Sequence, residues 1–282
     1  MKTMIIGLGL IGGSLAKQLK KNSDWVVAGF DIDESVCCDA INCGAVDEIW
    51  TVGTMSDADF TVLCLSPERS VAFLSENAKF LKSGSVVSDV CGVKQSVVYE
   101  CENICVSHGL HFVGGHPMAG KERSGFKNAD ENLFNRASYI LTVTEKTDEK
   151  ALEVAKRFIS SLKAAKTTVT DPETHDRVIA FTSQIPHVIA GAYVKSPTCL
   201  DRKGFSAGSF KDCSRVATVD ENLWSELFLA NREMLLAELD SLLLSLGDYR
   251  KAIADGDGDA LKKLILKGKL IKEQDLKESE GQ

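Results

Sequence analysis

The strongest constraint on the fold of this chain is a turn of closely spaced glycines near its N-terminus. The turn consists of Gly7, Leu8, Gly9, Leu10, Ile11 and Gly12. An apolar segment, residues 3–6, runs into it, and residues 14–21 follow with leucines at helical spacing. A second apolar segment, residues 25–30, comes next. A strand, a turn, a helix and a strand within about 30 residues predict a β-α-β unit.

The residue types in this unit predict a dinucleotide site in a Rossmann fold. Gly7 permits the tight turn, Gly9 lets the backbone approach a pyrophosphate, and Gly12 lets the helix pack on the strand. The N-terminus of the helix would attract the phosphates. Asp31, 19 residues beyond Gly12, is expected to bind the adenosine ribose. Because its carboxylate would repel the additional phosphate of NADP, the sequence predicts NAD; the alternative is a glycine turn that binds nothing.

Apolar and helical segments alternate as far as Asp171, which indicates a mostly parallel sheet with helices on both faces. Ser66 and Pro67 follow the strand expected at residues 60–65. They are candidates for a second cofactor contact, because ligands bind at the carboxyl ends of strands in such sheets.

The sequence pattern changes at Asp171, which together with Pro172 is typical of a helix start. Beyond it the sequence predicts helices and no strand. We expect a Rossmann domain over residues 1–171 and an all-helical domain over residues 172–282, with a charged tail that frays after Lys267. The helices are expected at about 173–195, 220–247, 249–254 and 257–267.

Composition argues against several classes of protein. A net charge of −7 without a long basic run argues against a nucleic-acid partner. Nine cysteines, an odd number without C-x-x-C spacing, indicate reduced thiols and no metal site. No segment reaches the about 20 apolar residues of a membrane span, and no signal peptide is evident. We therefore expect a cytoplasmic protein that does not bind membranes.

A second candidate site surrounds His116, which stands between Gly115 and Pro117 after the strand expected at residues 111–114. This position is at an open strand end, near the expected nicotinamide. A histidine with its ordinary pKa of about 6.5 takes up a proton near neutrality and suits a general base. Position alone leaves open a histidine that only bonds the backbone of a turn.

Three segments resemble motifs of the prephenate and arogenate dehydrogenases. Residues 115–125 resemble G-H-P-hydrophobic-A-G-x-E-x-S-G, residues 183–187 resemble S-H-L-P-H, and residues 209–217 resemble F-[RK]-D-x-[ST]-R-[IV]-A. The match continues through residues 220–224 and Asn231, so the resemblance covers nearly the whole chain. It implies NAD-dependent oxidative decarboxylation of prephenate to 4-hydroxyphenylpyruvate, a step in tyrosine biosynthesis. It also implies a homodimer formed through a helical domain like the C-terminal domain of 6-phosphogluconate dehydrogenase.

The resemblance implies roles for individual residues. His116 matches the base that takes the proton of the ring C4 hydroxyl while C4 gives a hydride to NAD+. Arg215 matches an arginine that holds a substrate carboxylate, and His187 matches a substrate-binding histidine; without the motifs, a surface salt bridge and helix packing would be expected of them. The other matches in the substrate site are Ser183, Gln184, Glu122, Asp212 and Gly92.

Two positions depart from the family pattern. Gly92 stands where many relatives have a serine that contacts substrate and cofactor, and a water or Ser124 could replace that hydroxyl. Gln184 replaces the first histidine of S-H-L-P-H. These changes bear on substrate preference, so arogenate dehydrogenase stays an alternative. A β-hydroxyacid or imine dehydrogenase is a further alternative, against which the His116 motif argues. A non-catalytic NAD sensor is another, against which His116, His187 and Arg215 together argue.

Overall fold

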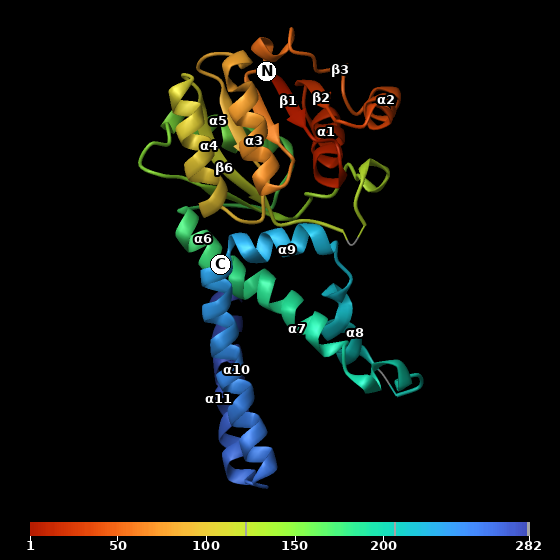
Figure 1. Cartoon of the computed structure of the whole chain (residues 1–282), viewed down its shortest axis with the longest axis vertical. Coiled ribbons are helices and arrows are strands. Elements are labelled where there is room, and N and C mark those ends of the chain that lie inside the picture. The colour runs from red at the N-terminus through yellow and green to blue at the C-terminus, as the bar shows by residue number, and fades with distance from the viewer. Residues whose placement is uncertain (122, 206, 281–282) are drawn as a thin grey trace. The chain divides into compact units, whose positions relative to one another are not determined.

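A sheet of eight strands forms the centre of the N-terminal part of the chain (Figure 1). The computed structural model describes residues 1–121, 123–205 and 207–280. The strand order is β3-β2-β1-β4-β5-β6-β7-β8, and all neighbours are parallel except β6 and β7. The mostly parallel sheet predicted from the sequence is therefore confirmed. The strands are β1 (Lys2–Ile6), β2 (Val26–Phe30), β3 (Glu48–Ile49), β4 (Phe60–Leu63), β5 (Val86–Asp89), β6 (His111–Pro117), β7 (Ser138–Thr142) and β8 (Lys166–Thr170).

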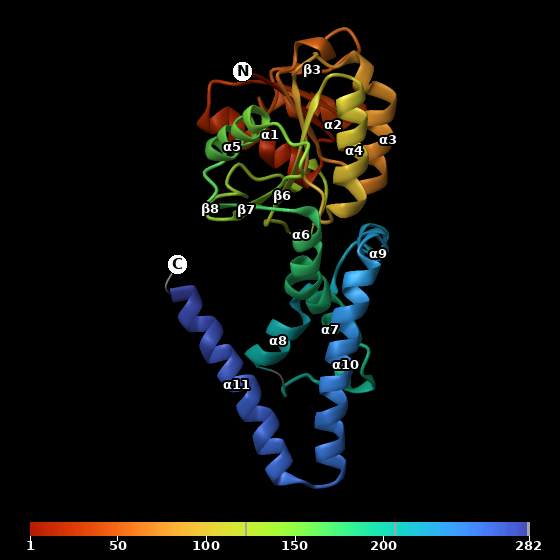
Figure 2. The same cartoon turned by 90° about the vertical axis from the view of Figure 1, so that its left-hand side faces the viewer.

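The helices lie on both faces of the sheet, as Figure 2 shows. The helices up to residue 193 are α1 (Leu10–Asn22), α2 (Glu34–Asn42), α3 (Pro67–Asn77), α4 (Gln95–Ser107), α5 (Glu149–Ser161), α6 (Pro172–Ile179) and α7 (Ile185–Tyr193). Later helices are α8 (Gly208–Ser214), α9 (Glu221–Ala230), α10 (Arg232–Ala254) and α11 (Gly258–Glu280). Short helical turns are η1 (Met55–Asp57), η2 (Ala78–Phe80), η3 (Phe126–Asn128), η4 (Ala180–Gln184), η5 (Pro197–Asp201) and η6 (Arg215–Ala217).

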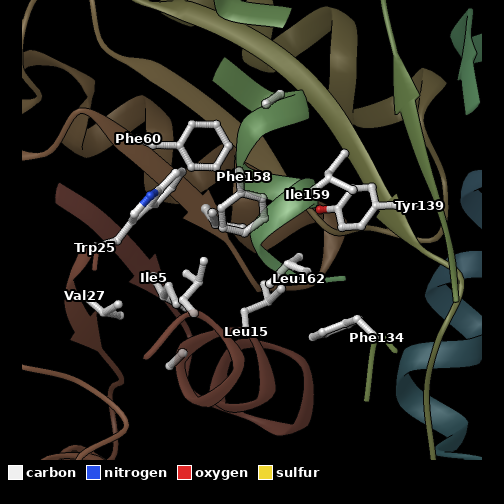
Figure 3. Close-up of a cluster of buried hydrophobic side chains, with 14 of the residues drawn as sticks. Ile5, Leu15, Trp25, Val27, Phe60, Phe134, Tyr139, Phe158, Ile159 and Leu162 are labelled. Atoms are coloured by element: carbon white, nitrogen blue, oxygen red, sulfur yellow. The ribbon is translucent and has the colours of Figure 1, made fainter. Parts of the chain in front are cut away.

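Alternation along the strands supplies two apolar layers, one on each face of the sheet. Ile5 of β1 belongs to one layer, and its neighbours Met4 and Ile6 belong to the other. The layer containing Ile5 packs against α1 and α5, and Figure 3 shows Leu15 of α1 and Phe158 of α5 in this cluster. The other layer packs against α3 and α4. Both faces of the sheet are thus covered at its centre, which explains why β1, β2 and β4 are mostly apolar.

The strand order reverses between β1 and β4. In sheets of this kind ligands bind at the carboxyl ends of the strands, beside that reversal. The turn after β1 and the ends of β4, β5 and β6 all lie at this edge, because these strands are parallel.

Two predicted helices differ from the observed ones. The helix expected at 173–195 contains a π-helical turn, η4, between α6 and α7. Pro186 follows that turn, and since proline donates no backbone hydrogen bond, the regular helical ladder is interrupted before it. The single helix expected at 220–247 is wrong: α9 ends at Ala230, and the non-helical backbone of Asn231 (φ −111°, ψ 28°) separates it from α10. The side chain of Asn231 is buried and bonded to Asp176 and Gln184, which holds this break in place.

The chain divides into two compact units, Met1–Arg232 and Glu233–Gln282. In the second unit, α10 and α11 diverge from the turn that joins them (Figure 2). The tail expected to fray after Lys267 is helical as far as Glu280. Among the described residues, no helix is long and apolar enough to cross a membrane.

Candidate active site

The glycine turn after β1 is shaped by close backbone contacts. Gly7 has a left-handed backbone (φ +90°), and a Cβ on it would lie 2.6 Å from the carbonyl oxygen of Cys64. A Cβ on Gly12 would lie 1.9 Å from the carbonyl oxygen of Gly7, so only glycine lets α1 begin this close to β1. A Cβ on Gly9 would have no neighbour within 4 Å. The space beside Gly9 is therefore open, as the approach of a pyrophosphate requires.

Asp31 directly follows β2, and its side chain binds the backbone of the glycine turn that follows β1. Its carboxylate accepts hydrogen bonds from the backbone N–H groups of Leu8 (2.8 Å) and Asp33 (3.0 Å). It also lines a cavity of about 500 Å³ that has an apolar floor, a second carboxylate and no lysine or arginine in its wall. The wall of this cavity therefore offers no cationic side chain that could bind the additional phosphate of NADP. Its wall consists of Phe30, Asp31, Glu34, Cys37, Cys38, Ile41, Asn42, Ile49 and Trp50.

A larger cavity, of about 920 Å³, joins the glycine turn to residues from later parts of the chain. It lies within the first compact unit, so its walls belong to one body. The turn contributes Gly9, Leu10, Ile11 and Gly12. The end of β6 and the segment after it contribute His116, Pro117, Met118, Ala119, Gly120, Lys121 and Ser124. The helical part contributes Ser183, His187, Arg215, Val216, Thr218, Val219, Asp220, Leu223 and Trp224.

His116 is the titratable group at the centre of this wall. It stands on β6 opposite Ile140 of β7, so its backbone is fixed by the sheet. Its Nδ1 lies 2.9 Å from Nε2 of His175. Burial lowers the pKa of His116 well below the ordinary 6.5, and repulsion from His175 and Lys94 lowers it further. The imidazole is therefore neutral at neutral pH and available to take up a proton.

A buried ion pair underlies His116. The Lys94 ammonium and the Asp89 carboxylate contact each other with no exposure to solvent. Lys94 also donates to the carbonyl of Gly115 (2.6 Å), and Asp89 accepts from the N–H of Gly115 (3.0 Å). These bonds tie the end of β5 to the residue before His116 and fix the position of its main chain.

Two cationic or potentially cationic side chains lie on the helical wall. His187 Nδ1 bonds the carbonyl oxygen of Ser183 one turn earlier (2.8 Å), and its ring stacks on Trp224 with centroids 3.6 Å apart. Burial lowers the pKa of His187, and the nearby charge of Arg215 adds to this shift. Arg215 itself begins η6 and lines the same cavity. This wall can bind a carboxylate through a guanidinium fork and an imidazole.

Comparison with known proteins identifies the family. The model of the prephenate dehydrogenase nucleotide-binding domain matches residues 15–168, and that of the prephenate dehydrogenase dimerization domain matches residues 171–267. The chain belongs to the prephenate dehydrogenase family.

Individual relatives agree with this assignment over nearly the whole chain. Prephenate dehydrogenase of Bacillus subtilis is 31% identical over 267 residues, which are 92% of this chain and 71% of that protein. The Aquifex aeolicus prephenate dehydrogenase, solved with hydroxyphenyl propionate and NAD+, is 30% identical with a TM-score of 0.86 over 98% of each chain. Synechocystis arogenate dehydrogenase is 26% identical with a TM-score of 0.83, over 97% of this chain and 99% of that one. The expected Rossmann and helical parts are those of this family.

Several residues predicted from the family motifs line the large cavity, and others do not. His116, Ser183, His187 and Arg215 line it together. Gln184 is buried and bonds Asn231 and the carbonyl of Leu227 instead. The remaining predicted residues are Asp212, which is exposed, Ser66 and Pro67, which start α3, and Glu122, which lies outside the described residues.

Gly92 lies beside the catalytic candidate although it does not line the cavity. A Cβ at this position would be 3.8 Å from Nε2 of His116 and 3.6 Å from a methyl group of Leu227, which are ordinary contact distances. A serine in a family member would therefore fit here without displacing the backbone, and its hydroxyl would be close to the imidazole.

Sequence reasoning missed three residues that the fold brings to this site. His175 and Asp176 follow the helix start at Asp171, where nothing local distinguishes them from a polar first turn. Trp224 was noted only as part of the motif match, and its stacking on His187 is visible only in the tertiary structure. The one signal available was that His175 is among just five histidines in the chain.

Proposed function

We propose that this chain is an NAD-dependent prephenate dehydrogenase that converts prephenate to 4-hydroxyphenylpyruvate and CO2. The observation that carries the proposal is one cavity whose wall holds the glycine turn, the neutral imidazole of His116 and the cation Arg215. A cofactor site, a base and a carboxylate-binding group are the three elements that this oxidation needs.

The chain's own residues would act on the substrate as follows. Arg215 and His187 hold a substrate carboxylate and orient the ring, and His116 takes the proton of the C4 hydroxyl as the C4–H bond breaks. NAD+, when bound, accepts the hydride. The carboxylate on the ring then leaves as CO2, and its bonding electrons make the ring aromatic. The proton on His116 returns to the phenolate oxygen, so the base is regenerated.

Arogenate is the second candidate substrate. It differs from prephenate only in carrying an amino group on the side chain, and Synechocystis arogenate dehydrogenase has the same fold over nearly its whole length. Assaying both substrates with NAD and NADP distinguishes the two activities. Prephenate is proposed as the substrate because the matching family models are those of prephenate dehydrogenase domains and the Bacillus subtilis and Aquifex aeolicus relatives are prephenate dehydrogenases.

We further propose a homodimer formed by the helical part of a chain divided into residues 1–171 and 172–282. The family models, which end at 168 and begin at 171, support this division, and the second model describes a dimerization domain. Large apolar side chains exposed on α10 and α11 support it as well; these are Leu236, Leu243, Leu244, Leu246, Ile253, Ile265, Leu266, Leu270, Ile271 and Leu276. Reduced cysteines suit the cytoplasm as the site of the enzyme.

Two substitutions test the proposed mechanism. His116→Asn should lower kcat by about 10²–10⁴-fold with a smaller change in KM, the usual effect of losing a general base. Arg215→Ala should mainly raise KM, because a contact of about 1.5–3 kcal/mol is lost from substrate and transition state alike. Steady-state kinetics measures both, and NAD affinity should survive both changes.

The pH dependence gives a second readout for His116. Only the neutral imidazole accepts a proton, and its pKa lies well below 6.5. Activity should therefore stay high as the pH falls to 6.5 and decline only at lower pH, and His116→Asn should abolish this acidic limb. Native kcat and an unchanged acidic limb in His116→Asn would refute the assignment of the base.

A further inference from the structure

His116 is one end of a buried chain of side-chain hydrogen bonds. Its Nδ1 lies 2.9 Å from Nε2 of His175, and Nδ1 of His175 lies 2.7 Å from a carboxylate oxygen of Asp176. His175 is 2% exposed and Asp176 is fully buried. His175 and Asp176 are adjacent on α6, whereas His116 is 59 residues away on β6.

Asp176 is held as an acceptor by the main chain at the start of α4. Its Oδ1 accepts from the N–H of Lys94 (2.7 Å), and its Oδ2 accepts from the N–H of Gln95 (2.9 Å). Lys94 also carries its positive charge nearby, paired with Asp89. A carboxylate whose two oxygens both accept from backbone N–H groups is held in place as a hydrogen-bond acceptor.

The Asp176 carboxylate determines which ring nitrogen of His175 and of His116 carries a hydrogen. Because Asp176 only accepts, Nδ1 of His175 must donate to it. Burial lowers the pKa of His175, so the ring is neutral and its other nitrogen, Nε2, only accepts. The partner nitrogen of His116, Nδ1, must then carry a hydrogen. A neutral His116 with its hydrogen on Nδ1 has a lone pair on Nε2.

We propose that His175 and Asp176 are positioning residues that keep the hydrogen of His116 on Nδ1 and leave its Nε2 as the proton acceptor. This inference rests on the proposed role of His116 as the base. The position of a Cβ on Gly92, 3.8 Å away, marks the side of the ring to which Nε2 points.

The same chain of hydrogen bonds stabilises His116 after it has taken up a proton. When Nε2 takes up a proton, the imidazolium still donates from Nδ1 to His175, and the Asp176 carboxylate lies beyond it. The other charges that face this group are Lys94 and Asp89, which neutralise each other as an ion pair. The positive charge formed on His116 is thus offset by Asp176 without any transfer of a proton to His175.

The direct test is the tautomer of His116 in the intact wild-type protein. Histidine labelled with ¹⁵N, observed by long-range ¹H–¹⁵N correlation at pH 7.5, reports which ring nitrogen carries hydrogen, and the spectrum of His116→Asn assigns the signals among five histidines. We expect hydrogen on Nδ1 and a free Nε2. Hydrogen on Nε2 would overturn the proposal even if His116→Asn is inactive, whereas a native kcat in His116→Asn would overturn the proposed function instead.

Two variants of His175 form a matched pair for kinetics. His175→Gln places an amide oxygen near the position of Nε2 and can accept from His116, whereas His175→Asn is too short to reach it. We expect His175→Asn to lower kcat by about 10–100-fold with KM for prephenate and NAD affinity nearly unchanged, and His175→Gln to recover most of kcat. Equal activities of the two variants, or a change in KM alone, would contradict the positioning role. If neither variant folds, the wild-type tautomer decides by itself.

Discussion

At the scale of single residues, Asp31 serves the fold and the cofactor site together. Its two oxygens accept hydrogen bonds from Leu8 and Asp33, which fixes the glycine turn against the end of β2. The same carboxylate gives the neighbouring cavity of about 500 Å³ a negative wall that no lysine or arginine offsets. We therefore propose that cofactor preference depends on the charge of Asp31, which backbone N–H groups hold in place.

Removing this charge should weaken the preference for NAD. We expect the wild type to use NAD far better than NADP, and Asp31→Ser to narrow the ratio of kcat/KM values by about tenfold or more, since about 1.4 kcal/mol of repulsion corresponds to tenfold. Asp31→Asn is the matched control, because it removes the charge but keeps an oxygen for the N–H of Leu8. Equal use of both cofactors by the wild type would refute the role of Asp31.

At the scale of elements, the contact between α1 and β1 decides whether the cofactor turn forms. Gly12 and Gly9 belong to the same motif but face different surroundings: Gly12 touches the backbone of Gly7, and Gly9 faces open space. We therefore propose that the motif combines one glycine that folding requires, Gly12, with one that cofactor binding requires, Gly9.

Alanine at these two positions should separate the two requirements. Gly12→Ala should destabilise the protein without cofactor by about 1–3 kcal/mol or more, because its Cβ overlaps a carbonyl oxygen and α1 must shift. Gly9→Ala should leave the melting temperature nearly unchanged but weaken NAD binding, because its methyl group occupies the space of the pyrophosphate. Thermal unfolding and NAD titration measure the two effects. A large loss of stability in Gly9→Ala would contradict this division.

At the scale of the whole molecule, the most notable feature of α10 and α11 is the number of large apolar side chains that they expose to solvent. Leu244 is 74% exposed and Ile253 is 64% exposed, and they belong to a second unit in which few apolar side chains are buried. Many exposed large apolar side chains on two neighbouring helices favour an interface with another subunit.

A dimer in solution is the expected consequence. Light scattering at micromolar concentration should give a mass about twice the 30.6 kDa of the chain. Leu244→Glu should shift this mass toward the monomer, while Val52→Glu, at an exposed apolar residue of the nucleotide-binding part, should leave it unchanged. A wild-type monomer would count against the proposed interface.

Local sequence determined the sheet and most of the cofactor site. Apolar runs bounded by glycine and proline mark strands, and the glycine turn, Asp31 and His116 each lie next to a strand end, so their positions follow from neighbours in sequence. Family motifs added His187 and Arg215. The two-residue strand β3 is too short to leave a pattern, and the break at Asn231 was missed because its cause is a bond to distant Asp176.

Only the tertiary structure decided how the proposed base is supported. His116 meets His175 across 59 residues, and Asp176 is fixed by backbone N–H groups of residues 94 and 95. No periodicity or spacing encodes these contacts, because hydrogen bonds between elements depend on how the sheet and α6 pack. The sequence by itself therefore identified the groups that we propose carry the chemistry, and packing decided which nitrogen of His116 bonds His175.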